Sequence, residues 1–292
     1  MSRAPVPATP NVPPRVGIVQ ASNPAPATTE RWEDGFAFEP EACDGGGVFD
    51  PCAVGIDLTP PAGPGVIEVE PFGVWAGDRC STFGRTERDW AGRARRLLEA
   101  AQSKHLGREL WRGDLARDAG WPNKYLAQHT AQVLNGSPQT PEDALALLEQ
   151  GLADCLAGGI GMIHATRQLV TLWSYRGALR FDGGQILTIN GTRVVSEAGY
   201  DGSGPAADAG SAPAAAGPGS VWAYGTGLVT VRLGAIETQP GSLEDARAWA
   251  QATDRRTNDV QVVATRQVAY DYPPCCHVAV EVDIDPPASG GS

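Results

Sequence analysis

Residues 256–284 read RTNDVQVVATRQVAYDYPPCCHVAVEVDI, two runs rich in β-branched residues on either side of the turn-forming stretch DYPP. In the second run, valine or isoleucine occupies every second position from 278 to 284, which is the period of a strand with one buried face. The first run, VQVVATRQVAY, also has the composition of a strand. We predict that the two strands pair with each other through a stiff turn and close the core.

The sequence CCH at the start of the last strand raises the question of a metal-binding or reactive site. Cys275 and Cys276 are adjacent, and adjacent residues of a strand point to opposite faces, so both thiolates cannot readily bind one ion. The Cys-x-x-Cys pairs typical of zinc sites do not occur in the sequence. We therefore interpret Cys275, Cys276 and His277 as structural residues. A zinc site and a catalytic Cys–His pair stay open as alternatives.

The composition is that of a globular protein, with 42 % hydrophobic and 20 % charged residues. At 292 residues the chain can bury a substantial core in one large domain or two smaller ones. Its net charge of −11 argues against a general nucleic-acid binder held by phosphate contacts. The sequence has no apolar run of the length that a signal peptide or a membrane helix needs. We expect a protein made and kept in the cytoplasm, with its six cysteines mostly reduced.

Upstream, turn-rich segments alternate with periodic ones. A long helix is predicted from its N-cap Thr86 to Trp111, because apolar residues recur there at spacings of three and four. A second helix begins at Thr140 and Pro141 and ends before the glycines at 158 and 159. A short buried strand (GMIHAT), a third helix (RQLVTLWSYRGAL) and three β-rich segments follow (ILTIN, GTRVVS and VWAYGTGLVTVRLGAIET). This order predicts a mixed α+β fold with two interleaved halves.

The sequence lacks the common catalytic motifs. It has no Gly-x-Ser-x-Gly elbow, no phosphate-binding P-loop and no His-Glu-x-x-His. His164 lies in the predicted buried strand GMIHAT, where a hydrogen-bonded core imidazole is favoured over a ligand or a base. We predict that the protein is not an enzyme and has no catalytic, cofactor-binding or metal-binding residues.

The order of these segments resembles the major capsid proteins of tailed bacteriophages with the Hong Kong 97-type fold, in particular short forms from phages of actinobacteria. Three stretches carry the resemblance, which spans about residues 32–285. TERDWAGRARRLLEAAQSKHLGRELW resembles the family's spine helix. GMIHATRQLVTLWSYRGAL with GTRVVSEAGYDGSGP resembles a strand, helix and strand of the axial domain. TNDVQVVATRQVAYDYPPCCHVAVEVDI, with Arg266, resembles the closing pair of strands.

The resemblance implies an α+β capsid fold with an N-terminal arm, an extended loop, a peripheral domain with a long spine helix, and an axial domain. It divides the chain into five segments: 1–31 (arm), 32–85 (extended loop and first peripheral-domain strands), 86–135 (peripheral domain with the spine helix), 136–255 (axial domain, with a mobile loop at 201–220) and 256–292 (closing peripheral-domain strands and C-terminal tail).

The implied function is structural. Copies of the chain would assemble in the host cytoplasm into pentamers, hexamers or both, and form the icosahedral head of a virion. Other capsid, portal and decoration proteins would be further partners. Double-stranded DNA would be enclosed without sequence-specific binding, and no membrane would be involved. Aromatic side chains contribute much of the energy of interfaces, so we expect contacts between subunits at Trp32, Phe36, Phe38, Phe72 and Trp75. For Phe72 and Trp75, a place in the chain's own core is an equal alternative.

Two other classes of function stay open. An encapsulin-like compartment shell would share the fold and package an enzyme, and a cytosolic enzyme would use Cys275, Cys276 and His277. Among capsid proteins, the members that cross-link join a lysine of the extended loop to an asparagine of a neighbouring subunit. Residues 32–85 contain no lysine, so we expect a shell without isopeptide bonds.

Overall fold

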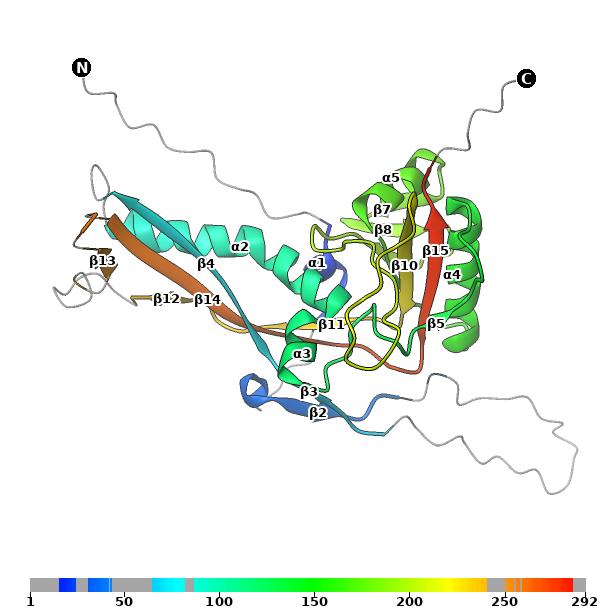
Figure 1. Cartoon of the computed structure of the whole chain (residues 1–292), viewed down its shortest axis with the longest axis horizontal. Coiled ribbons are helices and arrows are strands. Elements are labelled where there is room, and N and C mark those ends of the chain that lie inside the picture. The colour runs from blue at the N-terminus through cyan, green and yellow to red at the C-terminus, as the bar shows by residue number, and fades with distance from the viewer. Residues whose placement is uncertain are drawn as a thin grey trace, which may run out of the picture.

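The computed structural model describes residues 16–24, 31–41, 43, 65–81, 87–240, 250, 252–254, 256–257 and 259–285. These residues form an elongated molecule with a long extension on one side and a compact body on the other (Figure 1). We call the extension the arm, which is distinct from the N-terminal arm predicted for residues 1–31. A six-stranded sheet runs through the arm and a seven-stranded sheet through the body. Helices and strands are mixed along the chain, as the sequence predicted.

The arm is built on two long strands. Strand β4 (Phe72–Ser81) pairs antiparallel with β14 (Asp259–Asp271) over all ten of its residues. Shorter strands complete the sheet: β1 (Asn23–Pro24), β11 (Thr230–Leu233), β12 (Glu237–Gln239) and β13 (Thr253–Asp254). Helix α2 (Glu87–Arg112) runs along one face of the β4–β14 pair (Figure 1).

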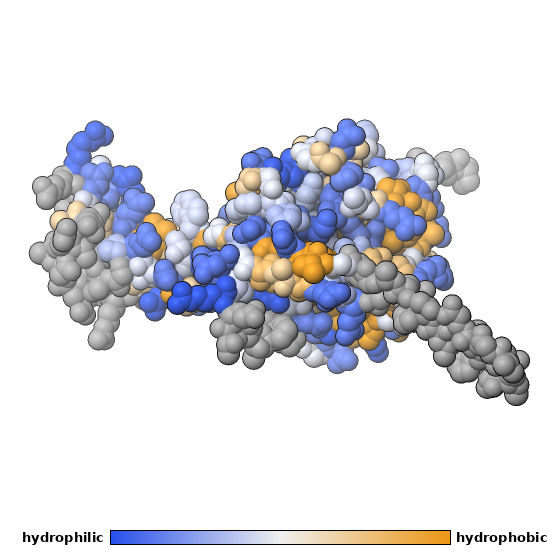
Figure 2. Space-filling view, turned by 90° about the horizontal axis from the view of Figure 1, so that it is seen from below, coloured by the Kyte–Doolittle hydropathy of each residue, from blue (hydrophilic) through white to orange (hydrophobic). Residues whose placement is uncertain are grey.

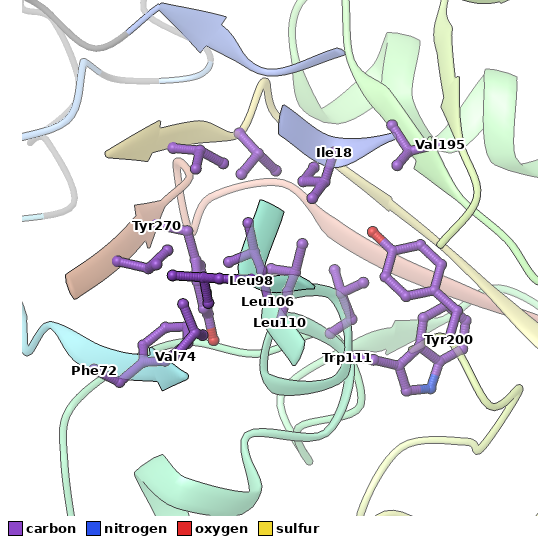
Figure 3. Close-up of a cluster of buried hydrophobic side chains, with 14 of the residues drawn as sticks. Ile18, Phe72, Val74, Leu98, Leu106, Leu110, Trp111, Val195, Tyr200 and Tyr270 are labelled. Carbon is purple, nitrogen blue, oxygen red and sulfur yellow. The ribbon is translucent and has the colours of Figure 1, made fainter. Parts of the chain in front are cut away.

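Alternation along β14 decides which side chains meet α2. Val260, Val262 and Ala264 are fully buried, whereas Gln261 between them is exposed, as expected for a strand with one covered face. The helix contributes a row of buried apolar residues, and Figure 3 shows its leucines beside aromatic and aliphatic side chains of the sheet. The buried apolar side chains of the helix are Trp90, Ala94, Leu98, Leu106, Leu110 and Trp111.

The body contains the strands β5 (Gln132–Val133), β15 (His277–Asp283), β10 (Ser220–Thr226), β6 (Met162–His164), β9 (Arg193–Val195), β8 (Gln185–Thr188) and β7 (Leu179–Asp182), in this spatial order. Helices α4 (Pro141–Cys155) and α5 (Arg167–Tyr175) bury their apolar stripes against one face of this sheet. The other face joins the core of the arm. Central strands of the sheet are therefore covered on both sides.

Smaller elements lie around these two sheets. Strands β2 (Phe36–Phe38) and β3 (Ile67–Val69) form a separate two-stranded sheet below the arm (Figure 1). The short helices are α1 (Ile18–Ala21), α3 (Asp114–Ala119) and the 3-10 turn η1 (Trp32–Asp34). None of the helices described is long and apolar enough to cross a membrane.

The predicted pairing of the last two strands is wrong. β14 pairs with β4, β11, β12 and β13 in the arm, whereas β15 pairs with β10 and β5 in the body. The DYPP stretch carries the chain from one sheet to the other, and we refer to residues 271–276 as the crossover. β15 is also not half-buried as expected, because Ala279 packs against the arm core while Val278 and Val280 pack against α4 and α5.

Strands of each sheet also come from different predicted segments of the chain. β11 and β12, which fall inside the segment predicted for the axial domain, pair with β14 of the arm. β15, which falls inside the segment predicted to close the peripheral domain, belongs to the body. Strands of one sheet thus come from more than one of the predicted segments, and the division of the chain into five segments stays a prediction.

The helix predictions are confirmed for α4 and α5. The Thr140 side chain accepts a hydrogen bond from the backbone N–H of Asp143 at 3.2 Å, and Pro141 occupies the first helical turn. Thr166 caps α5 in the same way, accepting from the N–H of Leu169. Helix α2 lies where it was predicted, but its expected cap, Thr86, lies outside the described residues.

The segment 201–220 was expected to be a mobile loop. Its first part packs into the molecule: Ser203 is buried, and its backbone oxygen accepts from the hydroxyl of Tyr224 at 2.9 Å. Gly204 pairs with Ala214 in an isolated bridge. Mobility stays a prediction for the exposed part of the segment between these contacts.

Candidate functional site

The cysteine pair singled out in the sequence lies in the crossover between the two sheets. Cys275 forms a disulfide with Cys43, and Cys276 forms a disulfide with Cys155, with Cα–Cα distances of 6.0 and 5.3 Å. Adjacent residues thus point in different directions, as expected, but the expectation of reduced thiols is corrected for these four cysteines. As disulfides they provide neither a free thiolate nucleophile nor a pair of thiolate ligands.

His277 takes part in a different set of contacts. Its Nε2–H donates to the backbone oxygen of Leu126 at 2.8 Å, and its Nδ1 accepts from the Gln128 amide at 3.2 Å. Burial lowers the pKa of His277 to about 4, an effect that the Leu126 hydrogen bond only partly offsets and that nearby Lys124 adds to. The imidazole is therefore neutral at pH 7 and fixed in one tautomer, which suits a core residue better than a general base.

His164 is likewise a buried core imidazole, as the sequence indicated. The Thr226 hydroxyl donates to the Gly227 oxygen, so it accepts from Nε2–H of His164 at 3.0 Å, while Nδ1 accepts from the Tyr200 hydroxyl at 2.9 Å. Burial lowers the pKa of His164 to about 3. Throughout the described part of the chain, His, Cys, Asp and Glu side chains nowhere gather in threes at a distance suited to a metal ion.

One buried carboxylate escaped the sequence reasoning. Glu197 is 1 % exposed, and its Oε1 accepts from the backbone N–H of Ile18 at 2.6 Å. Burial raises the pKa of Glu197 to about 7, and the Ile18 hydrogen bond and the charge of Arg167 offset this only in part. The side chain joins the N-terminal helix α1 to the body, a structural role that no local motif announces.

The aromatic residues predicted for interfaces fall into two groups. Phe72 is buried in the chain's own core, edge-on to Tyr270. The alternative of a core position therefore holds for Phe72, and we no longer consider it an interface candidate. Trp75, three residues later, points to the opposite face of β4 and is 67 % exposed. We refer to this face, formed by residues 73, 75, 77 and 79 of β4 and 261, 263, 265 and 267 of β14, as the outer sheet face.

The remaining aromatic candidates, Trp32, Phe36 and Phe38, are half-buried near the same region. The guanidinium of Arg232 lies 4.2 Å from the centre of the Phe36 ring, which ties β2 to β11 of the arm. Glu33 of η1 and Gly73 of β4 line one shallow cleft of about 340 Å³. The structure thus places η1 at the border of the outer sheet face, next to the strand that carries Trp75.

The body exposes a second group of large apolar side chains, which the sequence reasoning missed. Tyr175 and Phe181 are 87 % and 67 % exposed. Ile160 and Ile189 are also exposed and line a cleft of about 530 Å³ between α4 and residues 188–192. Hydrophobic residues reach the surface over the rounded end of the body and in the middle of the molecule, whereas the arm is mostly hydrophilic (Figure 2). Apolar residues exposed in this number suit protein–protein contacts.

Comparison with known proteins gives a likeness in structure only. No family model matches the chain, and no curated protein matches its sequence. The holo-SrpI encapsulin complex from Synechococcus elongatus matches with a TM-score of 0.54 and 10 % identity, covering 100 % of this chain and 96 % of that one. The capsid of an empty GTA particle matches with a TM-score of 0.50 and 11 % identity (97 % and 94 % covered). A structure from Microbacterium phage Oxtober96 matches with a TM-score of 0.50 and 12 % identity (98 % and 96 %).

Proposed function

From the Hong Kong 97-type capsid fold of this chain, we propose that the protein is a shell subunit of a bacteriophage head. Copies assemble into pentamers, hexamers or both and enclose double-stranded DNA in the virion, after assembly in the host cytoplasm. The observation that carries the proposal is the likeness along nearly the whole chain to the capsid of a GTA particle. Portal and decoration proteins are further partners in this proposal.

The distribution of exposed apolar residues supports self-assembly. A ring of identical subunits needs two different contact surfaces on each copy, because each copy meets its neighbours head to tail. Here Trp75 lies on the arm, and Tyr175, Phe181, Ile160 and Ile189 lie on the body. We propose that the outer sheet face is one contact surface, with Trp75 at its centre and Trp32, Phe36 and Phe38 at its border.

Assembly of the purified full-length chain tests the proposal. We expect particles of tens of nanometres by light scattering and negative-stain microscopy. In the variant Trp75→Ser, the protein concentration needed for assembly should rise at least ~10-fold, because a tryptophan buried in an interface is commonly worth about 2 kcal/mol or more. Its thermal unfolding should stay unchanged, since the side chain is mostly exposed within its own chain.

Leu115→Ser is the matched control, because Leu115 is an exposed apolar residue on α3 and belongs to neither of the two strands that form the outer sheet face. It should assemble like the wild type. A protein that stays a monomer or dimer under all assembly conditions would contradict the shell proposal. Equal assembly of Trp75→Ser and wild type would contradict only the place given to Trp75.

A compartment shell is the second candidate, because the encapsulin complex matches with a TM-score of 0.54 over the whole chain. The contents of the particles distinguish the two. A phage head recovered from infected cells contains double-stranded DNA protected from nuclease, whereas a compartment contains a co-purifying protein and no protected DNA. The enzyme alternative loses its proposed nucleophiles while Cys275 and Cys276 are held in disulfides.

A further inference from the structure

The crossover is a junction at which two disulfides leave neighbouring residues in different directions. Cys276 binds Cys155, the last residue of α4, and Cys275 binds Cys43, five residues after β2. Because β14 and β15 lie in different sheets, the junction joins the arm, the body and the segment that follows β2. Sequence separations of 121 and 232 residues make both bonds long-range constraints on the chain.

The two bonds differ in access to solvent. Cys43 and Cys155 are both half-buried, so the difference lies in their partners: Cys275 is exposed, whereas Cys276 is fully buried among residues of α4 and β15. Thiol–disulfide exchange requires a thiolate to approach a sulfur atom directly, so access controls the rate. A dissolved thiol or disulfide can therefore approach Cys275, whereas Cys276 is shielded by the core of the body. We refer to Cys43–Cys275 as the outer bond and to Cys155–Cys276 as the inner bond.

We propose that Cys43 and Cys275 form a site of reversible oxidation that is separate from the inner Cys155–Cys276 bond. The oxidant is a small-molecule disulfide of the oxidised-glutathione class. The exposed Cys275 thiolate attacks one of its sulfurs and releases one small thiolate, leaving a mixed disulfide. The Cys43 thiolate then displaces the second small thiol, so the protein gains one disulfide and the oxidant is reduced to two thiols.

The consequence concerns when Cys43 becomes covalently joined to the crossover. In a reducing compartment the bond is open, and Cys43 is held at the body by packing against its core without a covalent bond. Under oxidising conditions the bond closes and ties residue 43 to the crossover. If the protein is a shell subunit, the bond is open during assembly in the cytoplasm and closes after the particles leave the cell. This timing rests on the shell proposal, whereas the chemistry of the site does not.

Differential alkylation of the native full-length protein tests the site. Oxidised protein is treated with dithiothreitol for increasing times, and free thiols are labelled with iodoacetamide. The protein is then denatured, fully reduced and labelled with N-ethylmaleimide before peptide mass spectrometry. We expect Cys43 and Cys275 to take the first label together, at least ~10-fold faster than Cys155 and Cys276, since burial slows attack on the inner bond. Oxidised glutathione should then restore the outer bond.

The variant Cys43→Ser is the matched control, because it leaves Cys275 without its partner and keeps the inner bond. Cys275 should then label without any reductant, while Cys155 and Cys276 stay protected. Equal labelling of all four cysteines, or a bond directly between Cys275 and Cys276, would overturn the proposal. Particle formation is measured separately in both redox states, so a protein that shows the labelling order but never assembles refutes the shell proposal and leaves this one standing.

Discussion

Glu197 is the buried residue for which the structure makes the sharpest pH prediction. Its pKa is raised by burial to about 7 from an ordinary value of 4.5, so the folded protein holds a proton that the unfolded chain releases between these values. The stability that this proton provides is complete below pH 4.5 and is lost as pH rises through 7. In Glu197→Gln, which cannot ionise, the free energy of unfolding relative to wild type should therefore rise by roughly 3 kcal/mol between pH 4.5 and pH 8.

Urea unfolding of both proteins at pH 4.5, 6 and 8 measures this difference. His164 and His277 act in the opposite direction, because their lowered pKa values cost stability as pH falls below 6.5. Both histidines are present in both proteins, so their effect cancels in the difference. A difference that stays constant from pH 4.5 to pH 8 would show that the carboxyl group of Glu197 titrates normally.

Single residues were predictable where their role is local. The burial of His164 followed from the apolar residues around it in GMIHAT, and the structure confirms it. The disulfide partners of Cys275 and Cys276 lie 232 and 121 residues away, and no periodicity in the sequence connects such positions. Glu197 was missed for the same reason, since its environment comes from Ile18 and from α2, both distant in the chain.

At the scale of elements, helix α4 allows a direct test of capping. The Thr140 hydroxyl accepts from the N–H of Asp143, and the carbonyl of Pro141 accepts from the Trp173 indole at 2.6 Å, so the start of α4 also holds α5. Thr140→Ala should lower the free energy of unfolding by about 1 kcal/mol, because a backbone N–H of the first turn loses its acceptor. Thr140→Ser keeps the hydroxyl and should stay within a few tenths of wild type in the same urea titration. Equal losses in both variants would indicate that the methyl group, not the cap, matters.

Helices were predicted better than strand pairings, and the crossover shows why. A helix satisfies its hydrogen bonds within a single segment, so its caps and its apolar stripe are visible in the sequence. A strand needs a partner that the sequence does not name. β14 and β15 follow each other through DYPP and were predicted to pair. Instead, β14 pairs with β4 over ten residues, and β15 pairs with β10 over seven.

At the scale of the whole molecule, the α+β class followed from the order of the elements and the capsid-type fold from the family resemblance, while the contact surfaces could be predicted only in part. Phe72 and Trp75 look alike as candidates in the sequence, but strand alternation sends one into the core and the other to the outer sheet face. The exposed group on the body, such as Phe181 and Ile189, was missed because each lies in a segment that reads as an ordinary strand or turn. Which faces stay uncovered is decided by packing between distant segments.

The low lysine content of the chain predicts how assembled copies are held together. An isopeptide bond needs a lysine amine, and the chain has only Lys104 on α2 and Lys124, with none between residues 32 and 85. The two described disulfides are both within one chain, so they join no copies. Assembled particles should therefore dissociate completely in denaturant with reductant and give a single band at the chain mass of 30.6 kDa. Lys104→Arg with Lys124→Arg should give the same band, and a ladder of multiples that persists in reductant and disappears in this double variant would show that lysine cross-links hold the shell.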